Sequence, residues 1–217
     1  MLSIVIPTLN AEETLTRTLS ALVPAVTTGV VREVVIADGG STDGTADIAE
    51  AAGCVWVSCE GGRGAQLAAG AEKSHRGDWL LFLNQDTVLD PGWSEELVQL
   101  IDRLERSGRE HDFAATYRLA FADVGWKPRL LEKLAAARSI LLARPTGGQG
   151  LLISRRLYTR IGGHRPSARR EDVDILRRIG RGRLCRLKTA ATMRAPESRR
   201  SSGLLRSLGR SVGLFIL

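Results

Sequence analysis

Acidic residues stand at the ends of two apolar segments of this sequence. Asp86 follows the apolar run Trp79–Leu83, and Asp38 ends the segment Glu33–Asp38. A carboxylate in such a place can hold a hard divalent cation against a diphosphate, or it can accept hydrogen bonds from a nucleoside. Taken alone, Asp86 fits the capping of the following turn or helix equally well, and the residues leave both interpretations open.

A second acidic pair, Glu171-Asp172, follows Arg169-Arg170 and opens a segment with helical spacing through Ile179. A carboxylate can act as a general base by taking a proton from a hydroxyl group. The neighbouring arginines should lower its pKa and keep it ionised. An acidic pair is also common at a helix N-terminus, where it interacts with the helix dipole. The residues alone favour this second reading.

A glycine-rich turn, Gly61–Gln66, carries Arg63 at the start of an alanine-rich segment that ends at Lys73. Backbone N–H groups and a cation at a helix start suit the binding of an anion. Glycines in turns often serve backbone geometry alone, so this signal is weak by itself.

The elements that must position these residues alternate between strand and helix. The expected strands are 2–6, 33–38, 54–57 and 79–83, and the expected helices begin near 11, 45, 63 and 93. Asn10 is expected to cap the first of these helices. The alternation predicts a parallel sheet with helices on both faces. Ligands bind beyond the carboxyl ends of the strands in such sheets, so Asp38 and Asp86 should meet at one edge.

The repeat breaks after residue 113, which predicts a mixed C-terminal part. Expected there are strands at 113–121 and 183–193, helices at 130–142, 155–161 and 169–179, and an apolar segment at 151–153. We expect a single domain over residues 1–200, divided near residue 110 where the repeat breaks. Residues 201–217 should form a basic amphipathic tail. This tail could dock on its own domain, dock on a second subunit of a homodimer, or contact an anionic membrane surface.

Charge and composition narrow the function classes. The 217 residues are 43% hydrophobic, with a net charge of +7 that divides into −10 over residues 1–126 and +17 over residues 127–217. The basic half suggests an anionic partner. It lacks the interleaved aromatic residues of nucleic-acid stacking platforms, so no nucleic acid is expected. No apolar run is long enough to span a membrane. The three cysteines lack metal-ligand spacing and should be reduced and buried, which favours a cytoplasmic protein. Its basic tail would allow it to associate with a membrane surface.

Two common nucleotide-binding patterns are missing. A GxGxxG dinucleotide fingerprint should follow the first strand, where the sequence has Pro7-Thr8-Leu9-Asn10, and no Walker A pattern occurs. The nucleotide site is therefore neither of the NAD type nor of the P-loop type.

Six motifs, in order, resemble the inverting family-2 glycosyltransferases. They are SIVIPTLN (3–10), VVIADGGSTDGT (34–45), GRGAQ (62–66), GDWLLFLNQDT (77–87), GGQG (147–150) and RREDVDILRRIG (169–180). The resemblance implies an α/β fold of the GT-A type, with one Rossmann-like, mostly parallel sheet. Within the domain over residues 1–200 it implies a nucleotide-binding half (1–110) and an acceptor half (111–200). It also implies a nucleotide-diphospho-sugar donor, most simply a UDP-sugar, a Mn²⁺ or Mg²⁺ cofactor, and transfer with inversion to an acceptor of unknown identity.

The resemblance assigns roles to individual residues. Those expected to bind the nucleotide-sugar are Pro7, Thr8, Asn10, Asp38, Ser41, Arg63 and Gln85. Asp86 matches the metal-contacting acid of the family's DxD motif, whose first acid is here Asn84. Glu171-Asp172 matches the ED motif, in which Asp172 is the catalytic base. Two alternatives remain: a nucleotide-sugar binder without turnover, supported by the single acid at 84–86, and a protein that binds an anionic surface.

Overall fold

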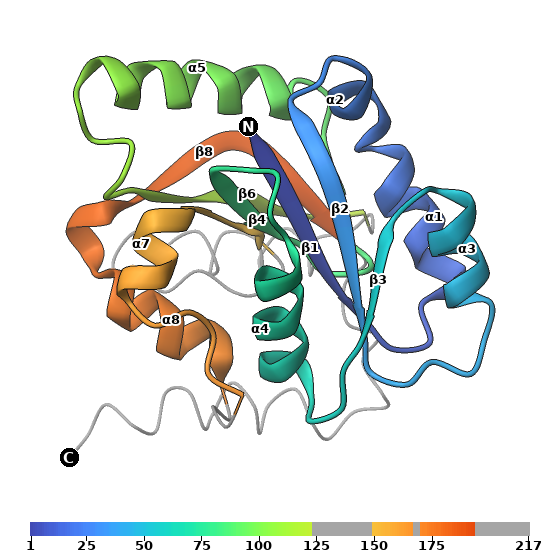
Figure 1. The fold of residues 1–217 in the computed structure, drawn as a ribbon. Coiled ribbons are helices and arrows are strands. Elements are labelled where there is room, and N and C mark those ends of the chain that lie inside the picture. Colours follow the sequence, from blue (N-terminus) through green and yellow to red (C-terminus); the bar gives the residue numbers. More distant parts are fainter. Residues whose placement is uncertain (123–148, 167–169, 194–217) are drawn as a thin grey trace, which may run out of the picture.

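The computed structural model describes residues 1–122, 149–166 and 170–193. One twisted sheet lies between two layers of helices (Figure 1). The expected helix at 130–142 and the tail at 201–217 lie outside the described residues. Within the described residues, no helix is both long and apolar enough to cross a bilayer.

The observed elements follow the expected alternation closely. The strands are β1 (Leu2–Thr8), β2 (Val31–Asp38), β3 (Val55–Ser58), β4 (Trp79–Phe82), β5 (Val88–Leu89), β6 (Ala114–Phe121), β7 (Leu151–Ser154) and β8 (Leu184–Met193). The helices are α1 (Glu12–Ser20), α2 (Val23–Thr27), α3 (Thr45–Ala51), α4 (Arg63–Lys73), α5 (Trp93–Arg106), α7 (Arg155–Arg160) and α8 (Glu171–Ile179). The short elements α2 and β5 were not expected from the sequence.

The sheet confirms the α/β fold class and its mixed second part. The strand order is β3-β2-β1-β4-β7-β6-β8-β5. The first four of these strands pair in parallel, whereas β7 runs antiparallel to both β4 and β6. Strand β8 pairs in parallel with β6, and β5 runs antiparallel to β8. The described parts of both halves of the chain therefore complete one sheet.

Alternation along the strands divides the core between the two faces of the sheet. In β4, Trp79 and Leu81 pack in the cluster that contains residues of α1 and α5, whereas Leu80 and Phe82 pack in the cluster that contains residues of α4, α7 and α8. Successive strand side chains point to opposite faces, so an unbroken apolar run is what a strand covered on both sides requires. The apolar run Trp79–Leu83 therefore reports a doubly covered strand.

Helix α4 lies close to the sheet because Gly70 has no side chain. A Cβ atom at Gly70 would lie 2.4 Å from Val5 Cγ1 and 3.3 Å from Ala37 Cβ. Gly70→Ala should therefore lower the free energy of unfolding by about 1–3 kcal/mol, as overpacking of a core does. Chemical denaturation would measure this, with Gly182→Ala as the control because no atom lies within 4 Å of its Cβ position. Equal stability of the two variants would contradict this packing.

The expected cap of the first helix is wrong. Asn10 has φ 49° and its Oδ1 accepts a hydrogen bond from the backbone N–H of Thr42 at 3.0 Å. The amides at the start of α1 are instead satisfied by the first residue of α3 and by the loop before it, because Ala11 N donates to Thr45 Oγ1 (2.8 Å) and Glu12 N donates to Asp43 Oδ2 (3.1 Å). A side chain from another segment has taken the role of the local cap.

Candidate active site

Asp38 ends β2 and is only 3% exposed. Its Oδ1 accepts hydrogen bonds from Thr8 Oγ1 (2.9 Å) and Ser41 Oγ (2.5 Å), and its Oδ2 accepts from the backbone N–H groups of Gly40 (2.9 Å) and Ser41 (2.7 Å). Burial works to raise the pKa of Asp38, but these hydrogen bonds outweigh it and lower the pKa. The carboxylate is thus ionised and shapes the turn Gly40-Ser41.

The loops after β1 and β4 are tied together by Gln85. Its Oε1 accepts from Leu9 N at 2.9 Å and its Nε2 donates to Leu9 O at 3.4 Å, while Thr18 Oγ1 donates to the Gln85 carbonyl. Asn10 N donates to Ser41 Oγ at 2.8 Å. The structure therefore brings Asn10, Ser41 and Gln85 to one sheet edge, as their expected common role requires. Pro7 and Thr8 are buried within β1 at the same edge.

Gln66 also lies at this edge of the sheet. It belongs to the motif GRGAQ, but its role was not predicted from the sequence. It is 6% exposed, and its Nε2 donates to the carbonyl oxygens of Thr8 (2.7 Å) and Ala37 (2.9 Å). A buried polar side chain needs such partners. Gln66 therefore joins α4 to the ends of β1 and β2. The sequence signal for such a role was a polar side chain among the small and apolar residues of an alanine-rich helix.

Arg63 joins the first turn of α4 to the first turn of α8. Its Nε lies 2.9 Å from Glu171 Oε1, and its Nη2 lies 4.0 Å from Asp172 Oδ1. Gly64 permits this approach, because a Cβ atom there would lie 2.8 Å from the carbonyl oxygen of Arg165. The expected basic and acidic residues, more than 100 positions apart in sequence, thus meet in one site.

The expected pKa direction for the base is wrong. Burial raises the pKa of Asp172, the Arg63 guanidinium works against that rise, and the charge of Glu171 adds to it. Asp172 lies at the start of a helix packed on the sheet, so the loss of hydration outweighs a guanidinium 4.0 Å away. A raised pKa makes a stronger base once the carboxylate is ionised.

Asp86 lies in the loop after β4, near Arg63. Burial raises the pKa of Asp86, and its own backbone N–H and the Arg63 charge act in the opposite direction. The neighbouring Asn84 Oδ1 is buried and has no hydrogen-bond partner among the described residues. A buried oxygen without a partner, two residues from a half-buried carboxylate, has the donor chemistry that a bound cation would satisfy.

A small pocket separates the start of α8 from the sheet. Its polar lining is Arg63, Thr116, His164 and Asp172, and Leu67 and Phe82 are among its apolar lining. His164 is 5% exposed and packs edge-on against Phe82, with the ring centroids 4.5 Å apart. Sequence reasoning missed His164; it read the adjacent Gly162-Gly163 only as the end of a helix.

Comparison with known proteins shows the family of this chain. Residues 3–109 match the family described as glycosyl transferase family 2. These residues place the chain in that family. A search of curated proteins gave no match.

Solved structures share the fold seen here. Glucosyl-3-phosphoglycerate synthase from Mycobacterium tuberculosis, solved with Mn²⁺, UDP and glucosyl-3-phosphoglycerate, has a TM-score of 0.61 and 23% identity over 96% of this chain and 75% of its own. Residues 1–349 of S. aureus TarS give a TM-score of 0.67 and 20% identity over 88% of this chain and 60% of that chain. These likenesses establish the GT-A fold.

Candidate oxygen ligands for a divalent metal lie in the loop after β4. No group of three or more His, Cys, Asp or Glu side chains gathers within the described ranges in a way that could hold a metal. The Asp86 carboxylate and the Asn84 amide oxygen, two residues apart, nevertheless match the donor chemistry of Mg²⁺ or Mn²⁺, since Mg²⁺ is commonly bound by one or two carboxylates plus phosphate oxygens. The residues fit a metal held jointly with a diphosphate.

Proposed function

We propose that this family-2 protein is an inverting glycosyltransferase that moves a sugar from a nucleotide-diphospho-sugar, most simply a UDP-sugar, to an acceptor hydroxyl. The carrying observation is the meeting of Arg63 with Glu171 and Asp172 at the sheet edge where Asp38 and Asp86 also lie. The family match supports the same donor chemistry.

Each group has a distinct task in this proposal. Inversion needs one displacement at the anomeric carbon, with the acceptor hydroxyl losing its proton as the bond to the leaving diphosphate breaks. Asp172 takes that proton. Glu171 holds Arg63, and Arg63 faces the developing negative charge. Asp86 and Asn84 would hold a divalent metal, which supplies charge stabilisation to the departing phosphate when bound.

The nucleoside would lie over the turn that Asp38 shapes. We propose that Pro7, Thr8, Asn10, Ser41 and Gln85 form this region, with Asp38 as its organiser. A direct bond from Asp38 to a base would share an oxygen that already accepts two internal hydrogen bonds. The division into donor and acceptor halves near residue 110 is proposed on the same basis, because the acidic pair that would meet the acceptor lies in the second half.

A screen of UDP-, GDP- and dTDP-sugars, with and without Mn²⁺, tests the proposed function. We expect at least one UDP-sugar to bind and to release UDP faster with Mn²⁺ present. Calorimetry would measure the binding, and a coupled UDP assay would measure the release. Binding without release from any donor would instead support a nucleotide-sugar binder.

Replacement of Asp38 should weaken nucleotide binding and the fold together. Asp38→Ala leaves the donors of Thr8, Gly40 and Ser41 without their acceptor, at a cost of about 1–3 kcal/mol for each buried group left unpaired. We expect a lower melting temperature and weaker binding of UDP itself. Ser41→Ala keeps the carboxylate and is the matched milder variant. Unchanged UDP affinity in Asp38→Ala would show that Asp38 shapes the turn without serving the nucleotide.

A further inference from the structure

His164 occupies a constrained place in the pocket beside Asp172. Gly163, at φ 59°, is held against Tyr158, because a Cβ there would lie 3.0 Å from the tyrosine ring. On the other side, the carbonyl of Arg165 contacts the start of α4 at Gly64. The loop that carries His164 is thus fixed between α7 and α4.

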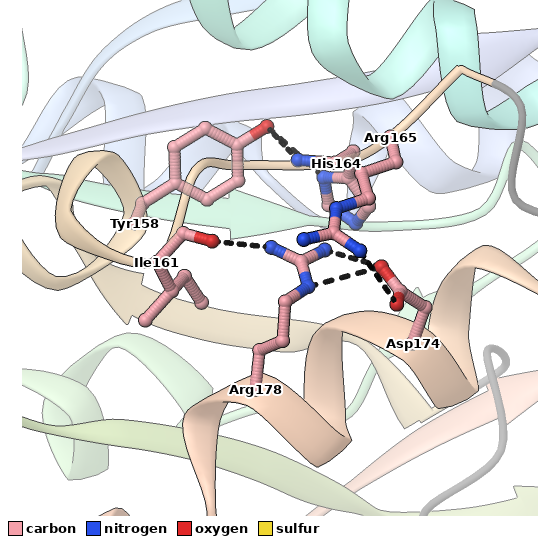
Figure 2. Close-up of polar contacts among 6 residues, drawn as sticks. All are labelled: Tyr158, Ile161, His164, Arg165, Asp174 and Arg178. Atoms are coloured by element: carbon pink, nitrogen blue, oxygen red, sulfur yellow. Dashed lines mark hydrogen bonds and ion pairs between the residues drawn. The ribbon is translucent and has the colours of Figure 1, made fainter.

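Hydrogen bonds and ion pairs of Arg178, Asp174 and Arg165 hold the same loop to α8 (Figure 2). Arg178 donates from Nη1 to the Ile161 carbonyl at 2.6 Å, and from Nε and Nη2 to Asp174 Oδ2 at 3.0 and 2.5 Å. Arg165 Nη1 lies 3.7 Å from Asp174 Oδ1. Asp174 is two residues beyond Asp172, so these polar contacts position His164 and the proposed base relative to each other.

Hydrogen bonds to Tyr158 define which ring nitrogen of His164 carries the proton. The backbone N–H of His164 donates to the Tyr158 oxygen at 3.0 Å, and the same oxygen lies 3.1 Å from His164 Nδ1 (Figure 2). The phenol has one proton to donate, and Nδ1 is its hydrogen-bond partner. A proton on Nδ1 would leave the phenol proton of buried Tyr158 unpaired, which is costly. The proton therefore lies on Nε2.

The His164 ring is neutral, and its Nε2 has no hydrogen-bond partner among the described residues. Burial lowers the pKa of His164 to about 3, with the charges of Arg63 and Arg178 acting in the same direction and Asp174 against them. In the described part of the chain, Tyr158 is the only hydrogen-bonding partner of the ring. A neutral side chain that carries an N–H donor, in a residue only 5% exposed, thus lines the pocket that Asp172 also lines.

We infer that Tyr158 holds His164 as the Nε2–H tautomer and that this N–H binds an uncharged oxygen, a hydroxyl of a polyol, on the acceptor next to Asp172. The inference rests on the proposed glycosyltransferase function and names the acceptor class. An anionic acceptor group would face the Asp172 carboxylate, and it would compete with the departing diphosphate for Arg63, the one cation of the pocket lining within the described residues. A neutral donor beside a base instead suits one hydroxyl held next to the hydroxyl that reacts. Tyr158 is then a positioning residue.

Imidazole ¹⁵N NMR of the full chain tests the tautomer directly. We expect His164 to show a protonated Nε2 and an unprotonated Nδ1, with no titration between pH 5 and 8 because its pKa is about 3. Tyr158→Phe should give a mixture of tautomers, and Thr159→Ala, at an exposed position of the same helix, should not. A protonated Nδ1 in the unmodified protein would overturn the inference.

Two amide variants test the acceptor role, with glycerol as the acceptor probe. Gln at 164 places an N–H near the position of Nε2, whereas Asn places one near Nδ1. The ratio of glycerol glycosylation to donor hydrolysis should fall about tenfold in His164→Asn, as for a lost hydrogen bond to a bound oxygen, and should be largely kept in His164→Gln. Equal ratios in the two variants, or no transfer to glycerol by a wild type that hydrolyses donor, would overturn the acceptor role. A wild type that releases no UDP from any donor would overturn the proposed function itself, and the NMR result would still decide the tautomer.

Discussion

Asp172→Asn should slow sugar transfer by about 10²–10⁴-fold while leaving donor affinity nearly unchanged, because general-base catalysis contributes that much to the chemical step. The substitution keeps the shape of the side chain and removes its ability to accept a proton. Single-turnover kinetics would report the loss of rate, and calorimetry with UDP would report the donor affinity. A loss confined to the donor affinity would contradict the role of base.

Glu171→Gln is the matched control for this prediction. Its carboxylate is bound to Arg63 at 2.9 Å, so its replacement should disturb the leaving-group side and cost less turnover than Asp172→Asn. If Glu171→Gln were the inactive variant and Asp172→Asn stayed active, the base would be Glu171. If both stayed active, Asp174 or another group would have to take the proton.

The raised pKa of Asp172 gives the pH dependence its sign. The base is active only when ionised, so activity should fall as the pH drops through a pKa that lies above the ordinary aspartate value. A folded-state pKa above the unfolded one means that ionisation of Asp172 costs stability at every pH above the unfolded pKa. Asp172→Asn should therefore raise the melting temperature at pH 7 while it removes activity and the acidic limb. A lowered melting temperature would contradict the burial argument.

Asp86→Ala should abolish the Mn²⁺ dependence of both UDP binding and turnover. Stabilisation of phosphate charge by a metal is worth several kcal/mol, so we expect a loss of about 10²-fold or more in turnover. Asp86 lies in a loop and is half-buried, so circular dichroism should show an intact fold. Asp47→Ala, which removes an exposed acid from α3, is the control and should leave the Mn²⁺ dependence unchanged.

The reciprocal variant, Asn84→Asp, makes the metal prediction sharper. Asn84 Oδ1 is a buried oxygen without a partner within the described residues. A second carboxylate there should tighten Mn²⁺ binding, because hard cations prefer charged oxygen ligands. Calorimetric titration of Mn²⁺ in the presence of UDP would measure this without any need for turnover. Weaker Mn²⁺ binding in Asn84→Asp would show that the metal does not lie between residues 84 and 86.

The parts predictable from sequence are those set by local pattern. The run Trp79–Leu83 reported a strand covered on both faces, and Gly62-Arg63 marked the start of α4. The antiparallel insertion of β7 between β4 and β6 has no local signal, because it depends on which strand edges are left to pair. The predicted cap of α1 was wrong for the same reason, because the side chains that bind these amides, Asp43 and Thr45, lie in the loop before α3 and at the first residue of α3.

The pKa shift of Asp172 and the role of His164 could not be predicted from the sequence. Neighbouring arginines suggested a lowered pKa for Asp172, but burial sets the direction, and burial depends on the tertiary packing of α8. His164 was missed because its role depends on Tyr158 and on the pocket, which only the fold assembles. Sequence motifs indicated the acidic and basic residues of the site, and the fold determined the direction in which the pKa of Asp172 shifts.

Proton NMR of the sugar released from UDP-glucose in the presence of Mn²⁺ tests the central claim most directly. UDP-glucose carries an α-linked sugar, and even water as the acceptor reports the stereochemistry before mutarotation mixes the anomers. We predict β-glucose as the first product from the unmodified protein and a rate reduced by about 10²-fold or more in Asp172→Asn. Initial release of α-glucose, or equal rates for the two proteins, would contradict an inverting transfer with Asp172 as its base.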